Sequence, residues 1–391
     1  MKSILVSCEN EQEMLELQLV LEELRREKPS WKIILFDTSN IFKGRKISYD
    51  PKLFDRIYSS INPFEGDFKS LSTLEKLNLA MRNALLIEDI FRKEKIHLFF
   101  TGVPLVFFRL AYIKSPRKPI YVTFVRSLLI QRDIPHSFSD RLSRLSQKIP
   151  ILGKLSIFNN WHSDFIVTIG ALNREYFISR GIPERKIVIS GPLFLDFYKL
   201  KLKKKNLQGN PYKEKINTVY LLSTAFKWHN DHVAHKEQKR LIEDFVRTYH
   251  LRYKKLFKLI FRPHPRDDMD EYQNIIRKYN ITIDKSKFTE FIEKVSPHTV
   301  LISTLSTLNL EWEYLGGKSI FLATPIIFRR YRNFYLTLNI QPVFSPDDAL
   351  ERLSNGKVRY HNFNNVFFTH QNGNVQFLKN FIIKILKNKR V

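Results

Sequence analysis

The stretch TVLISTLSTLNLEWEYLGGKSIFLA, residues 299–323, carries the pattern that decides the fold. An apolar run at 299–303 ends in hydroxyl residues, a helical pattern follows at 308–315, and a second apolar run follows at 319–323. Short, uninterrupted apolar strands on either side of a helix are typical of parallel strands that are buried on both faces. The stretch therefore predicts a β-α-β unit within a parallel sheet.

The same alternation of apolar strands and helical patterns covers most of the chain and is interrupted once. The expected strands are 3–8, 32–37, 97–102, 120–125, 165–170 and 186–191 before the interruption, and 218–224, 257–265, 299–307 and 319–323 after it. The interruption, 197–215, combines a run of lysines with Gly and Pro, as exposed linkers do. We therefore predict an α/β protein with two doubly wound, Rossmann-like parallel-sheet domains, whose strand ends face a ligand cleft.

The predicted division is a first domain at 1–198, a basic linker at 199–216, a second domain at 217–374 and a C-terminal amphipathic helix at 375–391. The apolar residues of this last helix share one side and lysines surround them. The stripe packs on the protein body in one interpretation and rests on an anionic membrane surface in the other. A basic amphipathic pattern at 138–157 allows the same two interpretations.

Composition limits the possible partners and compartments. The 391 residues contain 65 Lys and Arg against 39 Asp and Glu, a formal charge of +26, which favours nucleic acid, a phosphorylated substrate or an anionic membrane surface. The single cysteine, Cys8, excludes an internal disulfide framework and a multi-cysteine metal site. No signal peptide or membrane-spanning segment is apparent, so we expect a cytoplasmic protein.

A histidine lies between two prolines in the stretch KLIFRPHPRDD, residues 258–268. Each proline fixes its own backbone and restricts the residue before it, so His264 is held in a pre-set turn after a strand. Arg262 and Arg266 flank the turn, and guanidinium and imidazole groups both donate hydrogen bonds to phosphate oxygens. The segment therefore predicts a phosphate site; a solvated surface loop is the alternative.

Hydroxyl side chains occupy four of the five positions 303–307: Ser303, Thr304, Ser306 and Thr307. One hydroxyl is enough to cap a helix, and the free N–H groups and dipole of a helix start also attract anions. Glu311 and Glu313 follow within two turns, where one of them can reach a ribose hydroxyl. An ordinary acidic bias at a helix start explains these glutamates equally well.

A further group of polar residues follows the expected strand 218–224. Ser223, Thr224 and Lys227 are candidates for contacts to nucleotide or acceptor. His229 and His232 have the spacing of metal ligands, but no acidic or cysteine partner accompanies them at a fixed spacing. We therefore expect neither a metal nor another cofactor.

The strand that ends in RPHPR (262–266) and the strand that ends in STLST (303–307) resemble the nucleotide-sugar half of GT-B glycosyltransferases of bacterial surface-polysaccharide synthesis. Within that group they are similar to the His-Pro and Ser/Thr motifs of bacterial sialyltransferases and polysialyltransferases. The resemblance is specific over 258–323 and weaker at 164–198. It implies that His264 contacts the phosphate of a CMP-activated sugar and assists departure of the nucleotide, while Ser306 and Thr307 bind the same phosphate.

The general base is an open question. Sialyltransferases of this type carry an acidic pair followed by Gly in the first domain, and no such motif follows 120–125. Glu9, and Asp133 with His136 nearby, lie beyond expected strand ends and are the candidate bases, because an inverting transfer needs a base within reach of the acceptor hydroxyl.

The resemblance implies an inverting, metal-independent glycosyltransferase that is peripheral on the inner membrane face. Its donor would be a nucleotide-activated sugar: CMP-sialic acid, a related CMP-nonulosonate or CMP-Kdo. The acceptor would be a glycan or lipid-linked acceptor of capsule or lipooligosaccharide. A CDP-alcohol or other nucleotide-sugar transferase, a sugar-nucleotide epimerase and a nucleic-acid-binding protein are the alternatives. No zinc spacing, recognition-helix signature or base-stacking strand motif supports the last one, so no nucleic-acid partner is expected.

Overall fold

The structure, a computed structural model, describes residues 1–8, 11–42, 47–65, 71–102, 105–126, 128, 162–204, 216–227, 230–296, 298–358, 361, 363 and 366–388. These residues form two compact units. Unit 1 comprises the described residues of Met1–Leu129, Leu142–Asp196 and Asn365–Val391, and unit 2 those of Phe197–Asn364.

This division differs from the sequence-based one at two places. The described part of the expected linker, 199–204, is the end of helix α7 (Leu193–Lys204). The chain belongs to unit 1 again from 365 onward, whereas the sequence analysis extends the second domain to 374. Local composition marks polar segments, but it does not show which core a segment joins.

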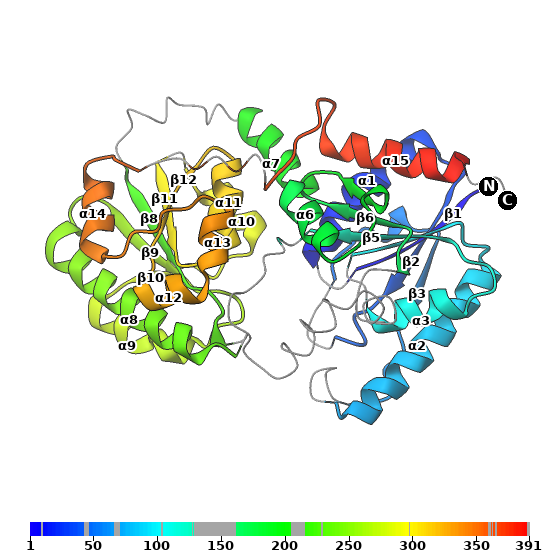
Figure 1. Cartoon of the computed structure of the whole chain (residues 1–391), viewed down its shortest axis with the longest axis horizontal. Helices are drawn as coiled ribbons and strands as arrows, with labels where there is room; N and C mark the ends of the chain where they lie inside the picture. The colour runs from blue at the N-terminus through cyan, green and yellow to red at the C-terminus, as the bar shows by residue number, and fades with distance from the viewer. Residues whose placement is uncertain are drawn as a thin grey trace. The chain divides into compact units, whose positions relative to one another are not determined.

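Unit 1 contains a parallel sheet of seven strands in the order β3-β2-β1-β4-β5-β6-β7. The strands are β1 (Ser3–Ser7), β2 (Lys32–Asp37), β3 (Arg56–Ser59), β4 (Leu98–Thr101), β5 (Ile120–Val125), β6 (Phe165–Thr168) and β7 (Ile187–Ile189). Helices α1 (Glu11–Glu27) and α15 (Asn374–Asn388) pack on one face, and α2 (Thr73–Lys93) and α3 (Val106–Lys114) on the other, as Figure 1 shows. Helix α6 (Ala171–Ser179) lies between β6 and β7 in the chain.

The C-terminal helix α15 is part of the core of unit 1. Its residues Leu378, Ile382 and Leu386 are at most 1% exposed and pack with the α1 side of the sheet. Full burial of such a side chain contributes about 1.5–3 kcal/mol. Lys379 also pairs with Glu27 at 2.6 Å. The apolar stripe predicted at 375–390 is thus covered by the protein itself.

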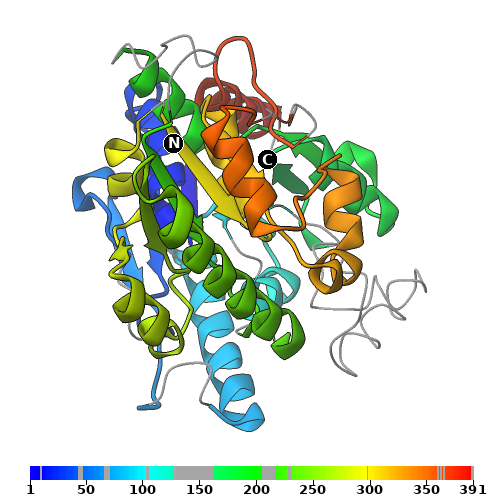
Figure 2. The ribbon, with the colours of Figure 1, turned by 90° about the vertical axis from the view of Figure 1, so that its left-hand side faces the viewer.

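Unit 2 contains a parallel sheet of five strands in the order β10-β9-β8-β11-β12. The strands are β8 (Thr218–Leu222), β9 (Lys258–Arg262), β10 (Thr282–Ile283), β11 (Thr299–Ser303) and β12 (Lys318–Phe321). The other elements are α8 (His232–Thr248), α9 (Gln273–Tyr279), α10 (Phe288–Lys294), α11 (Thr307–Tyr314), α12 (Pro325–Arg330), α13 (Arg332–Thr337) and α14 (Pro346–Ser354). Figure 2 shows α8 (green) and α14 (orange) over the strands, where their apolar residues join one core.

The predicted fold class is confirmed: both units are doubly wound parallel α/β sheets. Strands β3 and β10 were not predicted. Both are sheet edges with largely exposed side chains, so they lack the continuous apolar run that identifies a buried strand. Within the described ranges, no helix is long and apolar enough to cross a membrane.

Each sheet reverses its direction of growth once. In unit 1 the chain runs from β1 outward to β3 and then places β4 on the other side of β1. In unit 2 it runs from β8 outward to β10 and then places β11 on the other side of β8. Ligands of such sheets bind at the carboxyl ends of the strands beside the reversal. From the strand order we therefore expect ligand sites at the carboxyl ends of β1 and β4 in unit 1 and of β8 and β11 in unit 2.

Candidate functional site

The predicted site residues of unit 2 gather at the carboxyl ends of three neighbouring strands. Ser223 and Thr224 follow β8, His264 follows β9, and Thr304 to Thr307 follow β11. Because β8 lies between β9 and β11, its end connects the His-Pro turn to the Ser/Thr cluster. The structure thus brings together residues that are about 80 positions apart at a place where parallel sheets bind ligands.

The His-Pro segment forms a tight turn that is attached to β8. The carbonyl of His264 accepts a hydrogen bond from the Asp267 N–H at 2.9 Å, which puts Pro265 at the second position of a β-turn, where its fixed φ fits. The Ser223 hydroxyl accepts the His264 N–H at 2.8 Å and donates to the Asp267 carboxylate. Ser223 therefore fixes both ends of the turn.

The orientation of the His264 ring follows from the same turn. Its Nδ1 accepts a hydrogen bond from the Arg266 N–H at 3.1 Å. In the neutral ring the proton then resides on Nε2, which makes Nε2 a hydrogen-bond donor. The side chain is half-buried, so the ring is held firmly and is still accessible. A donor of this kind suits a phosphate oxygen.

Thr224 and Thr304 join the ends of β8 and β11. Their hydroxyls lie 2.9 Å apart, and Thr304 also donates to the side-chain oxygen of Gln238 at 3.0 Å. The same oxygen accepts the Thr224 N–H at 2.7 Å, and the Tyr335 hydroxyl donates to the Thr304 carbonyl at 2.8 Å. Both threonine hydroxyls are therefore hydrogen-bonded within the protein, and they hold the ends of β8 and β11 together beneath the candidate site.

Among the hydroxyls of the Ser/Thr cluster, Ser306 and Thr307 are the accessible ones. Ser303 and Thr304 are 2% and 4% exposed, whereas Ser306 is half-buried and Thr307 is exposed. Ser306 caps α11, with its hydroxyl accepting the Leu308 N–H at 3.2 Å, and Ser303 accepts the Ser306 N–H at 3.1 Å. The start of α11 thus presents two hydroxyls beside the positive end of a helix dipole.

The two arginines have different surroundings. The Arg262 guanidinium donates to Asp284 at 3.0 Å and to the Ser286 carbonyl at 2.7 Å, and it lies 4.5 Å from the centre of the Phe291 ring. Burial lowers its pKa, and Asp284 partly opposes this shift. Arg262 therefore connects β9 to the β10 side of the unit. Arg266 has an exposed side chain, and its backbone orients His264.

Lys227 belongs to an ion-pair network beside the turn. It pairs with Glu271, whose other carboxylate oxygen lies 2.6 Å from His235 Nε2. Hydrogen bonds from His235 and Lys227 lower the pKa of Glu271 to about 2. Lys227 therefore lies near the predicted site, but its ammonium group is paired with the Glu271 carboxylate.

Sequence reasoning missed Asp267 and His235. Burial raises the pKa of Asp267 even though Ser223 donates to it. Its Oδ1 and the Nδ1 of His235 are buried and have no hydrogen-bond partner among the described residues. A buried carboxylate oxygen without a partner is costly, and such groups concentrate at functional sites. The signal available in the sequence was the acidic residue directly after the RPHPR motif.

The two glutamates of α11 differ in their burial and in their hydrogen-bond partners. Glu311 is half-buried on the helix. Glu313 is buried, and its carboxylate accepts hydrogen bonds from the Ser319 hydroxyl and from the backbone N–H and Nδ1 of His361, the latter two at 2.8 and 2.9 Å. Glu311 therefore stays the candidate for a ribose contact.

Several predicted residues lie outside the described ranges: Glu9, Asp133, His136, His229 and the segment 138–157. His232 is the first residue of α8. The described portions of the chain contain no cluster of three or more acidic, histidine or cysteine side chains that can hold a metal ion.

The carboxyl edge of the unit 1 sheet has a polar cluster of its own. Glu13 and Glu16, on the first two turns of α1, are each 3% exposed. Glu13 lies so close to Gly102, the residue after β4, that a Cβ there would clash with its carboxylate. Glu16 accepts a hydrogen bond at 2.9 Å from Nε of Arg126, which follows β5. The two carboxylates thus lie beside the reversal between β1 and β4.

The Glu16 carboxylate has a hydrogen-bond partner at only one of its two oxygens within the described structure. Its Oε2 is buried and has no hydrogen-bond partner in the described structure. Burial raises the pKa of Glu16, and the Arg126 charge offsets part of that rise. Sequence analysis assigned this region to a helix and missed both glutamates. The available signal was two acids three positions apart on the side of the helix that carries Met14 and Leu17.

No protein-family model and no curated protein matches the sequence. The fold is similar to UDP-GlcNAc 2-epimerase from Neisseria meningitidis bound to UDP-GlcNAc, with 14% identity, a TM-score of 0.58, and 99% of this chain and 100% of that chain covered. It is similar to the lipopolysaccharide outer core galactosyltransferase WaaB, with 13% identity, a TM-score of 0.52 and 98% and 99% covered. It is also similar to the wall teichoic acid polymerase TagF, with 13% identity, a TM-score of 0.56 and 99% and 90% covered. The chain therefore has a GT-B-type fold.

Proposed function

We propose that this protein is a glycosyltransferase that binds a nucleotide-activated sugar at the carboxyl edge of unit 2. The observation that carries the proposal is the His264 turn, held by Ser223 on the strand next to the Ser306 helix start. The similarity in fold to a galactosyltransferase and to an epimerase bound to UDP-GlcNAc supports the same substrate class.

The proposed chemistry uses charge stabilisation of the leaving nucleotide. The Nε2–H of His264 and the N–H groups and hydroxyls at the start of α11 would bind the donor phosphate. These donors would stabilise the negative charge that develops when the glycosidic bond to the nucleotide breaks. Glu311 would bind the ribose. Because Arg262 and Lys227 are paired with acids, we assign them structural roles beside the turn and not contacts to the phosphate.

The acceptor hydroxyl must lose a proton to a base during an inverting transfer. Glu16 joins Glu9 and Asp133 as a candidate, because it is a buried, incompletely satisfied carboxylate with a raised pKa at the edge of the unit 1 sheet. The reaction we propose is metal-independent. The acceptor would be a capsule or lipooligosaccharide glycan, free or lipid-linked, and the enzyme would work in the cytoplasm beside the membrane.

For the donor we propose a CMP-activated sialic acid, nonulosonate or Kdo, on the basis of the RPHPR and STLST motifs alone. The second candidate function is a UDP-sugar 2-epimerase, which the similarity to the Neisseria epimerase over the whole chain favours. The two functions differ in their need for an acceptor. An epimerase acts on its nucleotide sugar alone, whereas a transferase needs a hydroxyl acceptor.

The decisive experiment compares CMP, CDP, UDP and GDP as stabilisers of the purified protein, because a ligand that binds only the folded state raises the Tm with its affinity. A preference for CMP supports the proposed donor, and a preference for UDP overturns it. Incubation of UDP-GlcNAc without acceptor then distinguishes the epimerase. We expect His264→Ala to reduce turnover at least 100-fold while it leaves the Tm within a few degrees, since one preorganised donor to a developing charge supplies about 10²–10³ in rate. Full activity of this variant would contradict the site assignment.

A further inference from the structure

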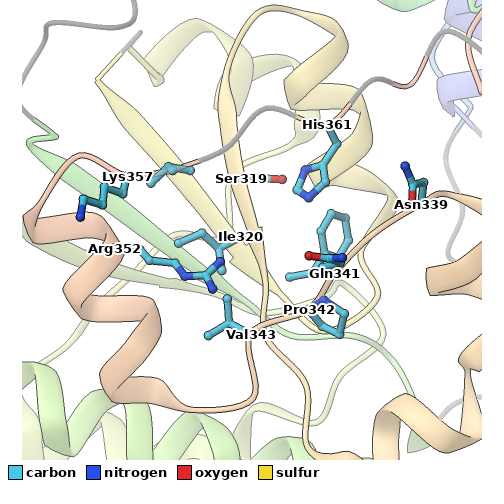
Figure 3. Close-up of a pocket in the computed structure, with 11 residues that line it drawn as sticks. Ser319, Ile320, Asn339, Gln341, Pro342, Val343, Arg352, Lys357 and His361 are labelled. Atoms are coloured by element: carbon cyan, nitrogen blue, oxygen red, sulfur yellow. The ribbon is translucent and has the colours of Figure 1, made fainter.

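A cavity of 490 Å³ lies at the β12 edge of unit 2 (Figure 3). Ser319, Ile320 and Phe321 of β12 form one wall. Val343 continues the sheet beyond β12, with its N–H donating to the Phe321 carbonyl at 2.8 Å, and it lines the cavity too. None of the residues that form the proposed nucleotide site lines this cavity. Its volume is within the range of about 300–1,000 Å³ that is typical of small-molecule sites.

Two cationic side chains line the cavity because of the way α14 ends. Gly356 has a φ of +67°, its N–H donates to the Leu353 carbonyl at 3.3 Å, and the Lys357 N–H donates to the Arg352 carbonyl at 2.8 Å. This Schellman motif reverses the chain and brings Lys357 beside Arg352. Figure 3 shows Arg352 extending from α14 into the cavity, with Gln341 and Pro342 on the opposite wall.

The two cationic side chains of this surface have no acidic partner in direct contact within the described structure. Both Arg352 and Lys357 are exposed, and neither forms an ion pair with a described residue. The described residues that line the cavity include no aspartate or glutamate. A guanidinium that extends into a cavity attracts a phosphate or a carboxylate, and Lys357 adds a second positive charge at the cavity rim, with its ammonium directed outward in Figure 3.

The opposite walls supply further polar groups. The His361 ring lines the cavity, and its Nδ1 is bound to the buried Glu313 carboxylate, which leaves Nε2 as the ring nitrogen for other partners. Asn339 adopts a left-handed conformation with a φ of +52°, which ends α13 and directs the chain past the cavity to Gln341. Amide groups of this kind hydrogen-bond hydroxyls as donors and as acceptors.

The lining of the cavity also contains apolar residues. Phe321, Val343 and Val358 are between 1% and 8% exposed and contribute to the lining. A ligand that interacts with the cationic, polar and apolar residues of this lining therefore has an anionic group, several hydroxyls and an apolar face. A phosphorylated monosaccharide has all three, because the C–H groups of a sugar ring form an apolar face.

We propose that this cavity is a binding site for a sugar phosphate. Arg352 and Lys357 bind the phosphate, Asn339, Gln341 and His361 bind ring hydroxyls, and the ring packs over Phe321 and Val343. This proposal does not depend on the proposed glycosyl transfer, since it uses a different part of unit 2.

Glucose 1-phosphate is a suitable probe, with titration calorimetry on the full-length protein as the measurement. We expect glucose 1-phosphate to bind at least tenfold more tightly than either glucose or inorganic phosphate. Arg352→Ala and Lys357→Ala should each weaken this binding at least tenfold. Arg277→Ala removes an exposed arginine on α9 that does not line the cavity, and it should leave the affinity unchanged.

Three results would overturn the proposal. Equal affinity for inorganic phosphate and glucose 1-phosphate would show an anion site without sugar recognition. Loss of binding in His264→Ala but not in Arg352→Ala would place the probe at the nucleotide site. Absence of binding by the unmodified protein, at probe concentrations up to the millimolar range, would show that the cavity does not serve this ligand class.

Discussion

Replacement of Ser223 by alanine tests whether this hydroxyl holds the His264 turn. The hydroxyl accepts the His264 N–H at 2.8 Å and donates to Asp267, so the variant loses two hydrogen bonds, one of them to a carboxylate. A neutral hydrogen bond contributes about 0.5–1.5 kcal/mol and one to a charged group about 1.5–3 kcal/mol. Because the turn is half-buried, water replaces part of this loss, and we expect a destabilisation of about 1–3 kcal/mol.

The assay combines thermal unfolding with nucleotide titration. For a unit of this size, about 1–3 kcal/mol corresponds to a fall in Tm of about 2–12 °C. The released turn should also weaken binding of the preferred nucleotide about tenfold. Asp267→Asn keeps an acceptor for the Ser223 hydroxyl and serves as the milder partner variant. The two substitutions should be non-additive in the double variant, since both act on one network. An unchanged Tm together with unchanged nucleotide affinity in Ser223→Ala would refute this reasoning.

Two further predictions concern unit 1. Glu16→Gln should lower transferase turnover at least 100-fold, which is the contribution typical of a general base, and should leave nucleotide affinity unchanged. Glu22→Gln, at an exposed position on the same helix, is the control. Equal turnover in both variants would remove Glu16 from the candidate bases. Glu94 is buried, which opposes ionisation, but hydrogen bonds from Lys32, Tyr58 and Arg56 outweigh burial and lower its pKa to about 2. An acid with a lowered pKa stabilises the fold above its unfolded pKa and loses this contribution as the pH falls. The stability attributable to Glu94 should therefore decline between about pH 4.5 and 2, and the acid-unfolding curve of Glu94→Gln should lack that component.

Local pattern predicted the fold class and most of the strands. Uninterrupted apolar runs such as 299–303 and 319–323 predict buried parallel strands because each needs helices on both faces. Strands β3 and β10 contain no such run, because their side chains are largely exposed and they depend on a neighbouring strand for their hydrogen bonds. Likewise, the amphipathic stripe of α15 revealed an apolar face, but only packing showed that α1 covers it.

For the candidate site, local pattern identified the turn and the helix start but not their supports. The prolines around His264 predict a rigid turn from backbone geometry alone. In contrast, Arg262 and Arg266 look equivalent in the sequence, and only the structure separates them: one pairs with Asp284 and the other orients His264. Gln238, which connects Thr224 to Thr304, lies in the middle of a helix and has no distinguishing local signal.

The sequence by itself determined the α/β class and predicted most strands and helices in their order, together with a phosphate site at two strand ends, because these depend on periodicity, proline geometry and residue type within short segments. The tertiary structure alone decided the order of strands in each sheet. That order places β8 between β9 and β11 and β4 beside β1, and it therefore brings Ser223 to His264 and Glu13 to Gly102. Contacts between residues so far apart in the chain arise from the packing of whole elements, which no local pattern encodes.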